Sequence, residues 1–244
     1  MSEYFDIHSH ILPGLDDGPL DLKTSKQMLY KAYDSGVGNI IATPHFREQR
    51  FTTSVAENKA AYKQVKDLIK EEGLDINLYL GNEIYYSSNT SKLLLDKEVL
   101  TMAGSDYVLL EFSPSSPYQY IKSGVQDIIM SGYIPILAHF ERYNNIVSSW
   151  NHIEEIYDMG VCIQINASAI SGSFLNKHTK LAKKLLKYNM VDFIATDSHN
   201  LDSRSPSLTD CINYIRKKYG NDLLNKLLYI NPSKLINNEE IKNI

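Results

Sequence analysis

The segment YFDIHSH, residues 4–10, starts with a short apolar run and ends in two closely spaced histidines. Similar apolar runs recur along the chain, and longer stretches separate them in which apolar residues repeat every three or four positions. The short runs are typical of buried strands, and the longer pattern is typical of amphipathic helices. The sequence therefore predicts a series of β/α units.

Seven strands are predicted from the apolar runs. They span Tyr4–Ile7, Asn39–Ala42, Ile76–Leu80, Tyr107–Leu110, Ile134–Ala138, Val161–Ile165 and Asp192–Ala195. Strands that are apolar throughout, rather than in alternation, favour a parallel sheet buried on both faces. We therefore expect a closed or nearly closed α/β barrel, with a doubly wound open sheet as the alternative.

Helices are expected between these strands. Residues 22–35 and 55–70 each show an apolar face with helical spacing. Glycines that should end helices stand at Gly36, Gly73, Gly132 and Gly160.

Composition limits the kind of protein. The 244 residues contain no linker rich in Gly, Ser and Pro, so we expect one domain over residues 1–244. The formal net charge of -4 argues against a surface for nucleic acid. There is no basic then apolar leader and no run of about 18 apolar residues, so we expect a cytoplasmic protein without membrane insertion.

The two cysteines are expected to be buried apolar residues. Cys162 and Cys211 fall in a predicted strand and a predicted helix, too few and too regularly placed for a disulfide framework. Neither precedes a glycine-rich turn that could bind phosphate together with an arginine. Chemistry through a cysteine nucleophile is therefore disfavoured.

Histidines and carboxylates gather directly after the predicted strands, where parallel α/β folds bind their ligands. These residues are His8, His10, Asp16, Asp17, His45, Glu83, Glu111, His139, Asp197 and His199. So many carboxylates and imidazoles on one rim would repel one another unless cations neutralised them, which predicts divalent metal. Mixed imidazole and carboxylate ligands suit zinc, manganese and iron, whereas magnesium and calcium prefer oxygen ligands.

Each histidine also has a simpler interpretation as a hydrogen-bonded core or loop residue. That interpretation is reasonable for one histidine but not for the whole set, because uncompensated buried charge is costly. His8 and His10 project to the same side of an extended segment and can bind one ion. His152 and His178 fall in helical stretches away from the rim, and we assign both to solvent.

Two arginines lie on the loops that follow rim histidines. Arg142 follows His139 and Arg204 follows His199. Each guanidinium could bind phosphate oxygens in a bidentate manner. The alternative for both is a surface arginine that pairs with a neighbouring acid.

Short motifs extend this pattern over nearly the whole chain. They are, in order, DIHSHILPGLDDG, ATPH, GNEIYY, LLEF, LAHFERY and ATDSHN. In this order and spacing the sequence resembles the polymerase and histidinol phosphatase (PHP) superfamily. Within it, DDGP, EIYY, HFERY and SHNLDSR resemble the bacterial capsule and exopolysaccharide tyrosine phosphatases of the CpsB and YwqE type.

The resemblance implies a distorted (β/α)7, TIM-like barrel that removes phosphate from tyrosines. It also implies three divalent ions, manganese foremost, with iron or zinc as alternatives. The implied ligands are His8, His10, Asp17, His45, Glu83, Glu111, His139, Asp197 and His199. Asp17 matches the family position better than Asp16. The implied partner is the phosphotyrosine tail of a bacterial tyrosine kinase of the polysaccharide export system.

The expected chemistry is hydrolysis without a covalent intermediate, in which a hydroxide bridging the metals attacks phosphorus in line. Arg142 and Arg204 would stabilise the transferring phosphoryl group. His45 and His199 complete the predicted catalytic set, and the identity of the proton donor stays open. A phenol, whose pKa is about 10, leaves without strong acid assistance.

Three rival functions are weighed against this one. A phosphoesterase for histidinol phosphate or a similar small metabolite would need extra groups for the amine of its substrate. A module that binds phosphotyrosine without cleaving it is disfavoured by the complete ligand set. A nucleic-acid hydrolase is disfavoured by the acidic balance of the chain.

Overall fold

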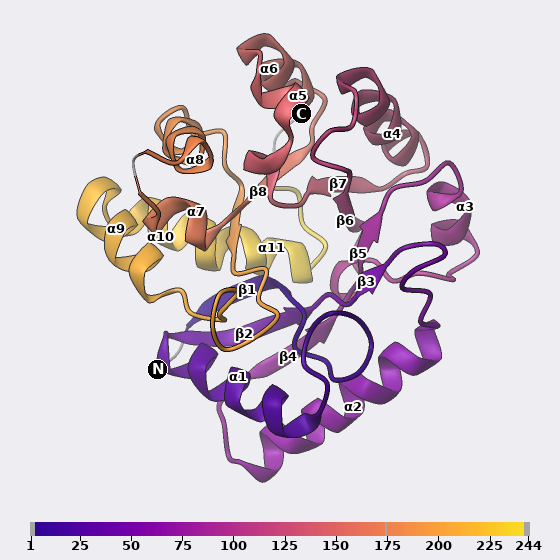
Figure 1. Cartoon of the computed structure of the whole chain (residues 1–244), viewed down its shortest axis with the longest axis vertical. Coiled ribbons are helices and arrows are strands. Elements are labelled where there is room, and N and C mark those ends of the chain that lie inside the picture. The colour runs from indigo at the N-terminus through magenta and orange to yellow at the C-terminus, as the bar shows by residue number, and fades with distance from the viewer. Residues whose placement is uncertain (1–2, 174, 242–244) are drawn as a thin grey trace.

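The computed structural model describes residues 3–173 and 175–241 and forms a ring of parallel strands with most helices outside it (Figure 1). The strands are β1 (Tyr4–Ser9), β2 (Val37–Ala42), β3 (His45–Phe46), β4 (Asn77–Leu80), β5 (Glu83–Tyr85), β6 (Tyr107–Glu111), β7 (Ile134–Leu137), β8 (Cys162–Asn166) and β9 (Phe193–Ala195). Their order follows the chain, β1-β2-β4 in one sheet and β3-β5-β6-β7-β8-β9 in the other. A doubly wound sheet would reverse its order at a switch point. The α/β barrel is therefore confirmed, and the open sheet is wrong.

Two of the predicted strands are interrupted near their carboxyl ends. β2 ends at Ala42 and the chain resumes as β3, and β4 ends at Leu80 and resumes as β5. Across these breaks the Gly81 N–H donates to the Ala42 carbonyl at 2.8 Å, and the Glu83 N–H donates to the Pro44 carbonyl at 3.2 Å. Each of the seven predicted strands therefore occupies one strand position of the barrel. The short strands β3 and β5, which continue two of these positions, were not predicted.

The ring closes between β1 and the segment that follows β9. The Asp197 N–H donates to the His8 carbonyl at 2.9 Å. The buried Asp6 carboxylate accepts hydrogen bonds from the backbone N–H and the hydroxyl of Thr196. The first and last strands of the barrel are thus held together by backbone bonds and by one buried carboxylate.

Alternate residues of each strand pack into two separate cores. Residues that point into the barrel form one cluster, which includes Phe5, Ile7, Ile41, Tyr107, Leu109, Ile136, Ala138, Phe193 and Ala195. Their neighbours Val108, Leu110, Leu137 and Ile194 pack outward with the helices in the larger cluster. The strands are buried on both faces, as their continuous apolar runs predicted.

The helices predicted over residues 22–35 and 55–70 are confirmed within one residue at each end. The helices that the structure describes follow one another in chain order. They are α1 (Leu22–Asp34), α2 (Val55–Glu71), α3 (Thr90–Leu95), η1 (Met102–Gly104), α4 (Tyr118–Met130), η2 (Phe140–Arg142), α5 (Asn144–Val147), α6 (Trp150–Asp158), α7 (Ala167–Ser171), α8 (Lys177–Lys187), α9 (Thr209–Tyr219), α10 (Asn221–Asn225), η3 (Lys226–Ile230) and α11 (Asn231–Ile236). Asp21 caps α1, and Ser54 forms a capping box with Glu57 at α2. Positive φ angles follow four helices, at Gly36, Gly73, Gly132 and Gly160.

Two further expectations about burial are tested by the structure. Cys162 and Cys211 are both buried, as predicted. Among residues 3–173 and 175–241, no helix is long and apolar enough to cross a membrane. The expectation of a single domain stays a prediction.

Replacement of Asp6 by alanine should destabilise the closure of the ring. The change leaves the buried N–H of Thr196 without an acceptor, so the free energy of unfolding should fall by about 3 kcal/mol. Chemical denaturation would measure the loss. Asp75→Ala, at an exposed loop position, is the control and should change stability by less than about 0.5 kcal/mol. Equal stability of the two variants would contradict a role for Asp6 in closure.

Candidate metal centre

Nine residues predicted as ligands come together at the carboxyl end of the barrel strands. They are His8 of β1, His10 after it, Asp17 before α1, His45 of β3, Glu83 of β5, Glu111 of β6, His139 after β7, and Asp197 and His199 after β9. Eight of them fall into three groups in which the nitrogen and oxygen atoms lie within 4.8 Å of one another. The ninth, His139, contacts two members of these groups.

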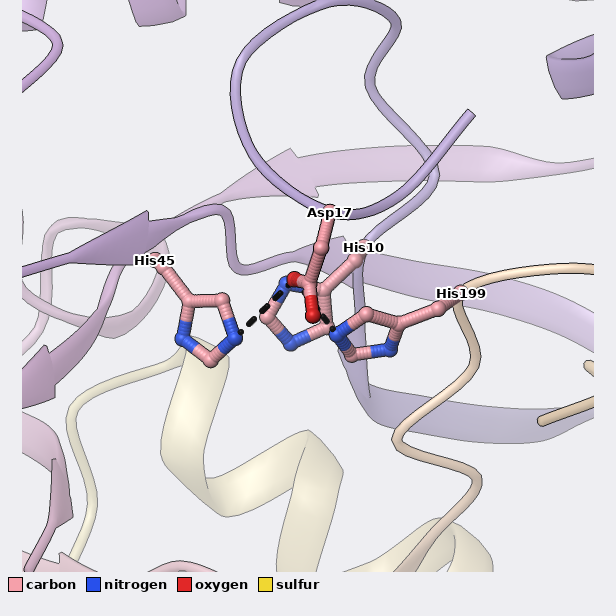
Figure 2. Close-up of side chains that lie close together, drawn as sticks. All are labelled: His10, Asp17, His45 and His199. Atoms are coloured by element: carbon pink, nitrogen blue, oxygen red, sulfur yellow. Dashed lines mark ion pairs between the residues drawn. The ribbon is translucent and has the colours of Figure 1, made fainter. Parts of the chain in front are cut away.

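The first group consists of His10, Asp17, His45 and His199 (Figure 2). Asp17 Oδ1 lies 3.3 Å from His45 Nε2 and 3.2 Å from His199 Nε2. The His10 and His199 rings are tilted, with centroids 3.7 Å apart. Side chains from the first strand, the loop before α1, β3 and the last rim loop therefore converge on one small region.

The second group is almost entirely buried and consists of His8, His10, Glu83 and Asp197. Glu83 Oε2 lies 3.2 Å from the Nε2 atoms of both His8 and His10, and these two nitrogens are 3.2 Å apart. Asp197 Oδ1 lies 3.6 Å from His8 Nε2. Because His10 also belongs to the first group, the two groups are adjacent.

The third group joins His45, Glu83 and Glu111. His45 Nδ1 lies 2.9 Å from Glu83 Oε2. His139 Nε2 adds to this side of the centre, at 2.9 Å from Glu83 Oε1 and 3.6 Å from Glu111 Oε1. Glu83 and its neighbours therefore link the second and third groups.

The adjacent residues Asp16 and Asp17 have different environments. Asp16 turns away from the groups, because its carboxylate contacts His10 Nδ1 at 2.7 Å and accepts the N–H groups of Gly18 and His45. It therefore orients the His10 ring, while Asp17 faces the centre. Gly18 makes this turn possible, because a Cβ there would stand 2.4 Å from the His10 carbonyl oxygen.

Unusual backbone geometry orients three of the predicted ligands, His8, His139 and Asp197. His139 and Asp197 adopt positive φ angles of 34° and 54°, a conformation that costs free energy in residues other than glycine. In β1 the register shifts between Asp6 and Ser9, so that Ile7 packs in the barrel core while His8, the next residue, reaches Glu83. Such distortions at strand ends are typical of functional sites.

The charges of the cluster perturb its protonation strongly. Burial would lower the pKa of His10, but the Asp16 carboxylate outweighs it and raises this pKa to about 9. Burial likewise opposes protonation of His45, yet Glu83 and Asp17 raise its pKa to about 11. Burial would raise the pKa of Glu83, but Coulombic interactions with His8 and His45 hold it well below its usual value. Without metal, protons therefore supply the positive charge that the buried carboxylates require.

The spacing of the donor atoms suits coordination of divalent ions better than hydrogen bonding between the side chains. Glu83 Oε2 and His199 Nε2 lie close to possible partners, yet they make no hydrogen bond within the described residues. Ligand atoms bound about 2.1 Å from one ion stand roughly 3.0 to 3.4 Å apart, similar to the shorter separations in these groups. Imidazole and carboxylate donors together suit manganese, iron or zinc.

Arg142 and Arg204 stand beside the centre, as predicted. Arg142 pairs with Asp197 Oδ2 at 3.1 Å, and Arg204 pairs with Asp197 Oδ1 at 2.6 Å. Both arginines line a cavity of about 180 Å³, together with Asp17, His45, Glu111 and His139. The alternative that each arginine pairs with an acid is therefore correct, but the acid is Asp197, a predicted metal ligand, and not a neighbouring surface residue. Their contact with phosphate stays a prediction.

A family model for capsular polysaccharide synthesis proteins, CpsB/CapC, matches residues 4–237. The chain belongs to the CpsB/CapC family. The predicted resemblance to the CpsB and YwqE type is thereby confirmed.

Named relatives and a solved structure resemble this CpsB/CapC protein over nearly its full length. The tyrosine-protein phosphatase CpsB of Streptococcus pneumoniae is 38% identical over 95% of this chain and 97% of its own length. CpsB of Streptococcus agalactiae is 32% identical over 97% of this chain and 99% of its own. A crystal structure from work on YwqE of Bacillus subtilis and CpsB of Streptococcus pneumoniae, called unique metal-dependent tyrosine phosphatases, superimposes with a TM-score of 0.90. It is 28% identical and covers 98% of this chain and 96% of that one.

Several supporting residues of this CpsB/CapC chain were not predicted from the sequence. Gln164 in β8 contacts His8 Nδ1 at 3.2 Å and accepts the N–H of His139 at 2.7 Å. Asn166 donates to Asp197 Oδ2 at 2.9 Å. The signal for Gln164 was a lone polar residue inside an apolar strand. Arg47, which also lines the 180 Å³ cavity, could have been found from its place two residues after the rim histidine His45.

The two remaining histidines lie outside the centre, but they are less exposed than expected. His152 is half-buried and stacks on Tyr118 with ring centroids 3.8 Å apart. His178 is half-buried and contacts the Glu141 carbonyl through Nδ1 at 2.6 Å. Their exclusion from the centre is correct, but their assignment to solvent is only partly so, because each packs against a neighbour.

Metal binding should release protons. The raised pKa values of His10 and His45 mean that the metal-free rings carry protons at pH 7, and a metal ion must displace them. Apparent metal affinity should therefore rise with pH between 6 and 8.5, and about one or two protons should be released per protein. Calorimetry of manganese binding in buffers of different ionisation enthalpy would measure this. Affinity that does not depend on pH would contradict the prediction.

Asp16 and Asp17 should be separable by mutation. Asp17→Asn removes an oxygen that faces the first group, so we expect loss of one bound ion after dialysis, measured by elemental analysis. Asp16→Asn weakens only the support of the His10 ring, so affinity should fall about 10- to 100-fold with full occupancy at saturating metal. The reverse pattern would assign the ligand role to Asp16.

Proposed function

We propose that this chain is a metal-dependent protein-tyrosine phosphatase that acts on a bacterial tyrosine kinase of the polysaccharide export system. The single observation that carries the proposal is one cavity lined by two arginines and by members of the first and third candidate metal groups, with the buried second group directly adjacent. The similarity to CpsB phosphatases over nearly the full length of the chain supports the same activity.

Three divalent ions, manganese foremost, fit the three groups. His10, Asp17, His45 and His199 would hold the first; His8, His10, Glu83 and Asp197 the second; and His45, Glu83, Glu111 and His139 the third. Ions bound in this way lower the pKa of water for attack on phosphorus and neutralise charge on phosphoryl oxygens. Iron and zinc remain alternatives by donor chemistry.

The arginines would bind and orient the phosphoryl group. Arg142 and Arg204 both pair with Asp197 and line the same cavity, so both guanidinium groups can meet a phosphate placed against the metal ligands. Guanidinium binds phosphate oxygens in pairs and cannot lose its proton at neutral pH. The arginines therefore favour the charged, trigonal phosphoryl group of the transition state.

The histidines in the predicted catalytic set are better suited to holding metal than to donating a proton. Burial lowers the pKa of His199, so its ring is neutral at pH 7, the form that binds a cation. His45 touches both Asp17 and Glu83 and is shared by two groups. A phenolate, with a pKa of about 10 for its acid, leaves without a strong proton donor.

The lining of the cavity favours phosphotyrosine over a small cationic metabolite. Its two acids, Asp17 and Glu111, both belong to metal groups, so neither is free to pair with an amine. Its four arginines would repel the ammonium group of a substrate such as histidinol phosphate. The Phe51 ring at the same cavity offers an apolar wall for a phenyl ring.

The proposal extends to the partner and its setting. A disordered, phosphorylated kinase tail suits a rim site that is open to solvent. Such a tail is phosphorylated where ATP is present, so we place the activity in the cytoplasm and link it to capsule or exopolysaccharide synthesis. One domain over residues 1–244 carries the activity in this proposal.

The test is phosphate release from a phosphotyrosine peptide, assayed beside histidinol phosphate and a phosphoserine peptide. Chelated protein should be inactive, and manganese should restore activity. His139→Ala removes a contact to Glu83 and Glu111 and should lower kcat/KM at least about 100-fold. His152→Ala, outside the centre, is the matched control and should keep activity.

Other outcomes would redirect the proposal. Preference for histidinol phosphate would keep the metal chemistry and replace the substrate. Tight binding of phosphotyrosine without turnover would indicate a binding module. Activity that survives complete metal removal would overturn the metal-dependent mechanism itself.

A further inference from the structure

Two arginines of a tight turn beside the cavity have no role in the mechanism above. We name residues 47–51 the Arg turn. The Arg47 N–H donates to the Phe51 carbonyl at 2.8 Å, and the Phe51 N–H donates to the Arg47 carbonyl at 2.9 Å. Gln49, between them, adopts a positive φ of 68°. The turn is therefore closed by its own backbone bonds and presents its side chains in a defined arrangement.

Aromatic contacts tie the Arg turn to the metal centre. The Phe51 ring stacks on the His45 ring with centroids 5.4 Å apart and an interplanar angle of 10°. The Arg47 guanidinium lies 4.0 Å from the centre of the Tyr85 ring, and Tyr85 pairs with Glu111 across β5 and β6. Both ends of the turn thus rest on residues that belong to the centre or adjoin it.

The charges of the Arg turn are not neutralised within the part of the chain that the structure describes. Arg142 and Arg204 pair with Asp197, whereas Arg47 and Arg50 form no ion pair with any carboxylate among residues 3–173 and 175–241. The acid of the turn, Glu48, accepts a hydrogen bond from Asn89 at 3.1 Å instead. Two uncompensated positive charges at the mouth of a site attract anions.

The positions of these groups suggest what they bind. Arg47, Arg50 and Phe51 line the same cavity as Arg142 and Arg204, and Arg50 is exposed to solvent. If the phosphate of a phosphotyrosine lay against the metal ligands, the tyrosine ring would pack against Phe51. The residues that flank it in the peptide would then emerge beside the two arginines of the turn.

We propose that the Arg turn is a second anion subsite, which binds a carboxylate or phosphate on a residue next to the phosphotyrosine. This inference rests on the proposed function and adds a substrate preference to it. The favoured substrates are tyrosine sites flanked by acidic residues or by a second phosphorylated residue. Because the contact holds the substrate without touching the reacting atoms, its effect should appear in KM more than in kcat.

Three peptides test the subsite and separate its two sources of charge. One carries a phosphotyrosine with neutral neighbours, the second has glutamates beside it, and the third has a non-hydrolysable phosphonomethyl-phenylalanine beside it. For the manganese-loaded wild-type protein, kcat/KM should be about five-fold higher with an anionic neighbour than with a neutral one, as expected for one or two exposed charge pairs. The preference should shrink in high salt.

Variants assign the preference to the Arg turn. In the double variant Arg47→Gln, Arg50→Gln, the ratio of kcat/KM values for anionic and neutral peptides should fall to about one. Arg50→Lys should retain most of the ratio because it keeps the charge. Arg216→Gln, on α9 near Tyr4, is the matched control and should leave the ratio and the activity unchanged.

The outcomes separate this inference from the proposed function. A wild-type ratio of one with good cleavage of all peptides overturns the subsite and leaves the phosphatase standing. A ratio that survives in the double variant also overturns it, because the preference then arises elsewhere. Failure of the wild type to cleave any peptide would contradict both the anion subsite and the proposed phosphatase function. A ratio that depends on the two arginines for only one of the anionic peptides supports the subsite and identifies the anion it prefers.

Discussion

A carboxylate without solvent contact lies at the middle of the rim. Glu83 is fully buried, and four histidines, His8, His10, His45 and His139, contact its two oxygens. An ionised carboxylate in such a position is tolerated only if positive charge surrounds it. The four histidines lie at or just beyond the carboxyl ends of β1, β2 and β7, and from there their imidazoles reach Glu83 on β5. The arrangement of the strands and the electrostatics of the centre therefore depend on each other.

Asp197 connects this centre to the groups that would hold the substrate. Its carboxylate belongs to a metal group and also pairs with both Arg142 and Arg204. Its backbone adopts positive φ, and its N–H closes the ring of strands onto His8. One residue thus couples barrel closure, metal binding and the placement of the arginines. Substitution there would disturb all three, so it could not separate them.

The sequence was most informative where a local pattern coincides with a strand end. The apolar run 134–138 predicted both β7 and the rim position of His139, because strands and their carboxyl ends can be read from neighbouring residues. The break that separates β2 from β3 was not predicted, since hydrogen bonds to a distant segment maintain it. Motif resemblance favoured Asp17 over Asp16, whereas the physical reason is the contact of Asp16 with His10. Local sequence could single out Gln164 and Arg47, but it does not specify their partners His8, His139 and Tyr85, which lie on other strands and loops.

Closure of the ring between β1 and the segment after β9 affects the order in which the candidate metal groups can form during synthesis. Two of the three groups contain Asp197 or His199, so neither is complete until nearly two hundred residues have left the ribosome. Only the group of His45, Glu83 and Glu111 can assemble earlier in a nascent chain. A growing chain therefore offers few complete sites to metal ions, and completion of the three candidate groups is one of the last steps of folding.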